Sequence, residues 1–149
     1  MSNLLLDMIK DEAADYVDVR FTDPRGKLQH VTLCADQVDE DLIAEGFMFD
    51  GSSIEGWKSI EASDMKLMMD VDSAYVDPFY AEKTICVHCS VVEPDTGEAY
   101  TRDPRGTAQK AEAYLKSSGI GDVAYMGPEA EFFLFDDVRY AVTMNKVSF

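Results

Sequence analysis

Residues 16–34, YVDVRFTDPRGKLQHVTLC, constrain the fold of this chain more than any other stretch. At the start of this stretch valine and phenylalanine alternate with charged and polar residues, and a period of two is typical of a strand with one buried face. Residues 23–26, DPRG, then place proline second and glycine fourth, as in a type I turn, and another strand-like run follows. We therefore predict a β-hairpin.

The residues after the hairpin predict more of the same sheet and a helix packed on it. A helical pattern from about Val38 to Glu45 ends at Gly46, and GSSIEGW at 51–57 is typical of a loop. Further strands are predicted at 47–50, 65–72 and 83–93. These elements indicate an α+β fold, for which we prefer a β-grasp domain over residues 14–98. The strand order is not fixed by the sequence.

The first 13 residues predict a short N-terminal helix, for which Ser2 or Asn3 can serve as the N-cap. Its apolar stripe follows the helical period and consists of Leu4, Leu5, Met8 and Ile9.

A second unit is predicted from about residue 104 to residue 149. The string DPRG returns at 103–106, where Asp103 can cap a helix that starts with Pro104 and stops at Gly119. Residues 122–126 and 129–136 then read as strands, so we expect the start of an α/β unit. The sequence stops within that unit, and we expect it to be a truncated piece of a larger protein.

Charge and cysteine usage exclude several functions. The chain carries 29 acidic and 13 basic residues, a net charge of −16, which makes nucleic acids and anionic membranes poor partners. It also lacks a signal peptide and an apolar run long enough to span a membrane, so we expect a cytoplasmic protein. In CVHC, Cys86 and Cys89 would face opposite sides of a strand, and we interpret them as structural.

Two acids stand at the head of the apolar run GPEAEFFLF, residues 127–135. On a strand, Glu129 and Glu131 would share a face with their Cα atoms roughly 7 Å apart. Two ionised carboxylates in an apolar setting raise each other's pKa unless a cation lies nearby. These acids are therefore either solvated or bound to something positive.

Three stretches in this order resemble the bacterial type I glutamine synthetase family: FMFDGSSIEGW at 47–57, RDPRGTAQKAEAYL at 102–115 and GPEAEFFLFDD at 127–137. The resemblance covers essentially the whole chain and corresponds to the amino-terminal third of that family. It implies the ATP-dependent ligation of ammonia to glutamate through a γ-glutamyl phosphate. It also implies two divalent cations, Mg²⁺ or Mn²⁺, in sites between neighbouring subunits of a double-ring homododecamer.

The resemblance further implies roles for individual residues. Glu131 would bind the cation that fixes glutamate, and Glu129 the cation that accompanies ATP. Asp50 would reach a neighbour's active site to bind ammonium and accept its proton, with Ser53 close by. The remaining ligands would follow Phe149, so we expect the chain alone to be inactive.

Other readings remain open at the level of the sequence. A non-catalytic acidic β-grasp interaction module would explain residues 14–98. A simple divalent-cation binder would explain the acids, although they lack the spacing of an EF-hand loop. Asp50 can equally be a turn residue, and Trp57 is assigned no catalytic role.

Overall fold

The computed structural model describes residues 4–149, which form a mixed α/β structure. Its helices and strands are α1 (Leu4–Asp11), β1 (Tyr16–Thr22), β2 (Leu28–Cys34), α2 (Glu40–Glu45), β3 (Phe47–Asp50), β4 (Asp64–Met69), β5 (Tyr75–Val76), β6 (Thr84–Val92), α3 (Pro104–Ser117), β7 (Ala141–Thr143) and β8 (Lys146–Ser148). Short 3-10 turns lie between them: η1 (Ala35–Gln37), η2 (Gly51–Ser53), η3 (Ile60–Ala62) and η4 (Val71–Ser73).

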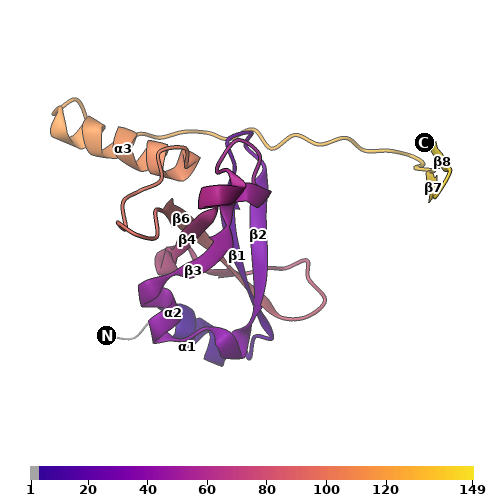
Figure 1. Ribbon diagram of the computed structural model, residues 1–149, viewed down its shortest axis with the longest axis horizontal. Helices are drawn as coiled ribbons and strands as arrows, with labels where there is room; N and C mark the ends of the chain where they lie inside the picture. The colour runs from indigo at the N-terminus through magenta and orange to yellow at the C-terminus, as the bar shows by residue number, and fades with distance from the viewer. Residues whose placement is uncertain (1–3) are drawn as a thin grey trace.

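One curled sheet organises the first hundred residues. Its strands lie in the order β2-β1-β6-β4-β3, and β5 pairs with β6 beside this path. The central strands β1 and β6 are parallel, whereas the other pairs are antiparallel. Figure 1 shows α1 and α2 at the end of the sheet opposite α3. The predicted α+β class and β-grasp arrangement are confirmed.

The predicted hairpin forms around its turn. Strands β1 and β2 pair in register from Tyr16 with Cys34 to Thr22 with Leu28. The amide of Gly26 donates to the carbonyl of Asp23 at 3.0 Å, which closes the turn, and Gly26 has a φ of 84°. A positive φ favours glycine at this place.

The predicted N-terminal helix and the predicted helix of the β-grasp domain are both present with small shifts. The proposed caps Ser2 and Asn3 of α1 lie outside the described residues. Leu5 is fully buried, but Leu4 is largely exposed, and Leu6 packs against the core instead. The second helix begins two residues later than predicted, because the side chain of Asp39 accepts a hydrogen bond from the amide of Leu42.

A buried carboxylate ties the hairpin to the segment around β5. Asp18 is fully buried, and its oxygens lie 2.7 Å from the Nε of Arg20, the Nδ1 of His30 and the Oγ1 of Thr32. Arg20 also donates to the carboxylate of Asp77 at 2.9 Å. Burial alone would raise the pKa of Asp18, but these hydrogen bonds outweigh it and lower the pKa.

An aromatic cluster closes the other side of the sheet around the chain's one tryptophan. The ring of Trp57 lies 5.5 Å from that of Phe21, 6.1 Å from that of Phe49 and 5.4 Å from that of Tyr100, between centroids. Aromatic pairs at such distances stabilise a core beyond their buried area. The cluster fixes the end of the loop that follows β3.

The start of this loop passes very close to β4. A Cβ atom on Gly51 would lie 2.4 Å from the Sδ of Met65, and the amide of Gly51 donates to the carbonyl of Ser63 at 2.7 Å. A side chain at this position would have to displace Met65, so glycine is favoured here.

The helix of the second unit is confirmed. Asp103 caps α3 by accepting from the amide of Arg105 at 3.0 Å, Pro104 is its first residue, and Gly119 follows its end with a φ of 70°. The stripe of Ala108, Ala111 and Leu115 faces the returning chain, with which it lines a cavity of about 420 Å³.

The strands predicted at 122–126 and 129–136 are wrong for this structure. These residues run as an extended segment without strand pairing, away from the sheet and toward the small hairpin of β7 and β8 (Figure 1). A strand is stable only with a hydrogen-bonded neighbour. Within residues 4–149 no strand pairs with this segment.

We predict that Asp18→Asn lowers the free energy of unfolding by about 3 kcal/mol at pH 7, because a buried ion pair loses one partner. The folded-state pKa of Asp18 is lowered, so its stabilisation is present above its unfolded pKa and is lost as the pH falls through the folded pKa. The difference between variant and parent should therefore shrink below about pH 4. Urea unfolding followed by Trp57 fluorescence measures this, and an equal difference at pH 7 and pH 3 would exclude a role for the charge.

We also predict that Gly51→Ala destabilises the protein by about 1 to 3 kcal/mol, because its methyl group must displace Met65. Gly106→Ala is a matched control: the nearest atom to its Cβ would be the Oδ2 of Asp103 at 3.5 Å, an ordinary contact. In the helix this change should stabilise by about 0.5 kcal/mol. Thermal unfolding compares the two, and equal effects would contradict the assigned close approach.

Candidate functional site

Asp50 ends β3 at the edge of the sheet, and its side chain is exposed. Its Oδ1 accepts hydrogen bonds from the hydroxyl of Ser52 at 2.7 Å and from the amide of Ser52 at 2.8 Å. Both bonds lower the pKa of Asp50, so the carboxylate is ionised at neutral pH. The loop thus presents a fixed negative charge to solvent.

A second acid lies opposite Asp50. In the antiparallel pair of β3 and β4, Asp50 is the register partner of Asp64, so both side chains start from the same face of the sheet. Like charges in this arrangement repel each other, and a cation between them relieves the repulsion. The sequence alone did not indicate Asp64, because its position depends on a strand register that the residue pattern leaves open.

Ser53 is also exposed, in η2 directly after Ser52. Ser52, rather than Ser53, is the residue that bonds to the carboxylate of Asp50. The hydroxyl of Ser53 is therefore not used to orient Asp50 within this chain.

The loop between Asp50 and Trp57 is held at its far end by residues that lie before α3. The hydroxyl of Tyr100 donates to the carbonyl of Trp57 at 3.0 Å. Arg102 donates through Nη1 to the carbonyl of Gly56, and its Nη1 lies 3.5 Å from the carbonyl of Trp57. With Gly51 fixed against β4, the loop is anchored at both ends.

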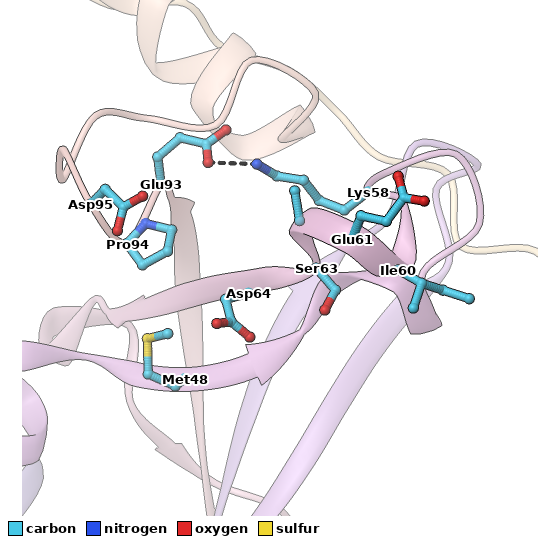
Figure 2. Close-up of a pocket in the computed structure, with 10 residues that line it drawn as sticks. Met48, Lys58, Ile60, Glu61, Ser63, Asp64, Glu93, Pro94 and Asp95 are labelled. Carbon is cyan, nitrogen blue, oxygen red and sulfur yellow. Dashed lines mark hydrogen bonds and ion pairs between the residues drawn. The ribbon is translucent and has the colours of Figure 1, made fainter.

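A hollow of about 500 Å³ lies beside this loop and is rich in acids (Figure 2). Lys58 crosses its rim to form an ion pair of 2.6 Å with Glu93, while Glu61, Asp64 and Asp95 supply further carboxylates. The surplus of negative charge disfavours a phosphate-bearing ligand and favours a cation. Within residues 4–149, however, no three His, Cys, Asp or Glu side chains are grouped so that they could hold a metal ion.

Glu129 and Glu131 lie in the extended segment after α3, and both are exposed. The rings of Phe133 and Phe135, two residues apart like the acids, lie 6.2 Å from each other, so the segment keeps the alternation of a strand. The structure thus preserves the spacing of the two acids but adds no further ligand to them from residues 4–149.

The cysteines of CVHC lie buried and unpaired in β6. Burial raises the pKa of Cys86 to about 11 and that of Cys89 to about 12. Both are therefore neutral thiols at physiological pH and poor nucleophiles. Their place three residues apart on a strand is as predicted, and their interpretation as structural residues stays a prediction.

Of the helices in residues 4–149, none combines the length and the apolar character that crossing a membrane requires.

Comparisons with known proteins converge on one family. The family model of the glutamine synthetase β-grasp domain matches residues 13–94, and that of the glutamine synthetase catalytic domain matches residues 101–149. Glutamine synthetase of Cereibacter sphaeroides is 76% identical over 144 residues, covering 97% of this chain and 31% of the relative. Glutamine synthetase of Rhodobacter capsulatus is 74% identical, covering 97% of this chain and 33% of the relative.

A comparison with solved structures agrees with the sequence comparisons. The cryo-EM structure of Plasmodium falciparum glutamine synthetase matches with a TM-score of 0.70 at 23% identity, covering 80% of this chain and 23% of that one. At that identity the match supports the fold. The chain thus spans about a third of the length of its curated relatives. A stand-alone interaction module would not explain the match to a catalytic domain after residue 100, and the chain belongs to the glutamine synthetase family.

Proposed function

We propose that the protein containing this chain ligates ammonia to glutamate at the expense of ATP, through a γ-glutamyl phosphate, and so serves nitrogen assimilation. The observation that carries the proposal is the anchored loop with an ionised Asp50 at its start, in a chain so similar to glutamine synthetases. The 149 residues alone are expected to be inactive.

In this proposal Asp50 attracts the ammonium ion at the active site of a neighbouring subunit. An exposed carboxylate of lowered pKa, with Asp64 opposite, suits the binding of a small cation. The same low pKa makes Asp50 a weak base in the chain as it stands. Burial by the neighbour would raise the pKa and bring it closer to that of a useful proton acceptor, and Ser53 would lie beside the bound ion.

Glu129 and Glu131 are proposed as ligands of two divalent cations, Mg²⁺ or Mn²⁺. Carboxylate oxygens are the ligands such hard cations prefer, so the two acids fit, and we propose that further ligands come from other parts of the assembled protein. Bound cations would neutralise charge on the transferred phosphoryl group. Holding the two acids at strand spacing lets each face its own cation.

The assembly and the division of the chain are likewise proposals. We propose an N-terminal helix over 1–13, a β-grasp domain over 14–98 and the start of the catalytic domain over 104–149. Head-to-tail interfaces, in which the loop of one subunit enters the site of the next, can close into a ring, and we propose a cytoplasmic homododecamer of two hexamers.

In the full-length protein, Glu129→Gln and Glu131→Gln should each lower kcat/KM by at least about 100-fold, because each removes a charge that the cation needs. Glu131→Gln should mainly weaken the cation that fixes glutamate, and Glu129→Gln the cation taken up with ATP. Activity measured across a Mg²⁺ titration distinguishes them. Parental activity in both variants would show that the two acids are merely exposed to solvent and bind no cation needed for the reaction.

Asp50→Ala should cost about 100-fold in ammonium use with less effect on ATP and glutamate, since it removes the carboxylate that binds and deprotonates ammonium. Rings mixed from equal amounts of Asp50→Ala and Glu131→Gln chains should regain about a quarter of the parental activity, because random assembly gives that share of sites both an intact loop and intact acids. If mixed rings form and stay inactive, Asp50 does not act across the interface.

A further inference from the structure

The segment between β6 and α3 returns across the Asp50 loop and is itself firmly held. Tyr100 is only 6% exposed, and its amide donates to the carbonyl of Val91 in β6 at 2.9 Å. Its hydroxyl donates to the carbonyl of Trp57, and its ring packs edge-on against the ring of Trp57. Tyr100 therefore connects the end of the loop to a central strand by both backbone and side chain.

Arg102 adds a second attachment at the same end of the loop. Its Nη1 lies within hydrogen-bonding distance of two successive carbonyls, those of Gly56 and Trp57. Gly56 has a φ of 84°, so the chain turns sharply here and directs neighbouring carbonyls toward one guanidinium group. A planar group with several donors suits such a pair of acceptors better than a lysine would.

Asp103, the next residue, links the same segment to α3. It is buried, its Oδ2 accepts from the amide of Val91 at 3.0 Å, and its Oδ1 accepts from the amide of Arg105 at 3.0 Å. Residues 100–103 therefore join three parts of the chain: the Asp50 loop, strand β6 and α3, the first helix of the region that matches the catalytic-domain model.

We propose that Tyr100 and Arg102 are positioning residues for Asp50 and serve the active site to which their own chain donates its loop. This inference rests on the proposed function. Neither residue reaches Asp50 itself; both fix the Gly56 end of the loop, while Gly51 is held separately by Ser63 and Met65. Their loss therefore loosens the loop at one end only and weakens ammonium binding without abolishing the reaction.

The first test compares single variants in the full-length protein. Tyr100→Phe and Arg102→Ala should each raise the KM for ammonium about fivefold, as expected for a lost hydrogen bond, and leave the KM values for glutamate and ATP near the parental ones. Arg102→Lys should restore part of the effect, because one donor can still reach a carbonyl. An unchanged ammonium KM, or equal rises for all three substrates, would overturn the proposal.

Arg25→Ala is the matched control. Arg25 also contacts the loop, through Glu55, but both side chains are largely exposed, at 69% and 71%. Exposed ion pairs contribute little, so the ammonium KM of this variant should equal that of the parent. A rise as large as that of Arg102→Ala would mean that any change near the loop produces the effect. Ring size measured for every variant confirms assembly, and Tyr100→Phe keeps the buried ring in place.

Mixed rings show which site the two residues serve. When Arg102→Ala chains are mixed with Glu131→Gln chains, sites with acids from the first and a loop from the second should bind ammonium with the parental KM. When Arg102→Ala chains are mixed with Asp50→Ala chains, active sites can use only the Arg102→Ala loop, so the raised KM should persist. Absence of the parental component from the first mixture would place Arg102 in its own chain's site and overturn the proposal.

The mixture of Asp50→Ala and Glu131→Gln separates this outcome from a failure of the proposed function. If that mixture regains activity but the Arg102 mixtures do not follow the expected pattern, only the positioning role is wrong. If it stays inactive in mixed rings, the donation of the loop is wrong, and the positioning role across the interface falls with it.

Discussion

The parallel pairing of β1 with β6 is the constraint on which the rest of the structure depends. It joins residues 16–20 to residues 84–88, so α2, β3, β4 and β5 all lie within the connection between the two central strands. Both strands are buried along most of their length, as parallel strands generally are. The pairing leaves β3 at the sheet edge and puts the segment after β6 beside the loop that follows β3.

Features that depend on neighbouring residues were predictable from the sequence. The hairpin follows from its turn and its period of two, and the cap of α3 from Asp103 and Pro104, because these signals act within a few residues. Asp50 was singled out by the resemblance of a short contiguous motif to a known family, and its role stays a proposal. By contrast, Asp64, Tyr100 and Arg102 reach the loop only through strand register and strand order, which no local pattern specifies.

For the segment around Glu129 and Glu131, a local pattern was present but predicted the wrong structure. Its alternating residues have the preference of a strand, but the neighbours that would pair with it are not among the described residues. Phe132, Phe133 and Leu134 are each at least 80% exposed. Apolar side chains gathered at this density are normally covered in a stable protein, and the described residues of this chain leave them exposed.

The Asp50 loop is different, because residues of this chain already hold it in place at both ends. It is anchored by Gly51 at one end and by Trp57 at the other, and Ser52 fixes the carboxylate between them. The conformational entropy of the loop is therefore lost when the chain folds, and the association of subunits does not have to order the loop as well. In the proposed function Asp50 acts in a neighbouring subunit, and a group used in this way gains from such anchoring because its position does not depend on contacts made after assembly. This is a physical reason for holding the loop with residues as distant in sequence as Tyr100 and Arg102.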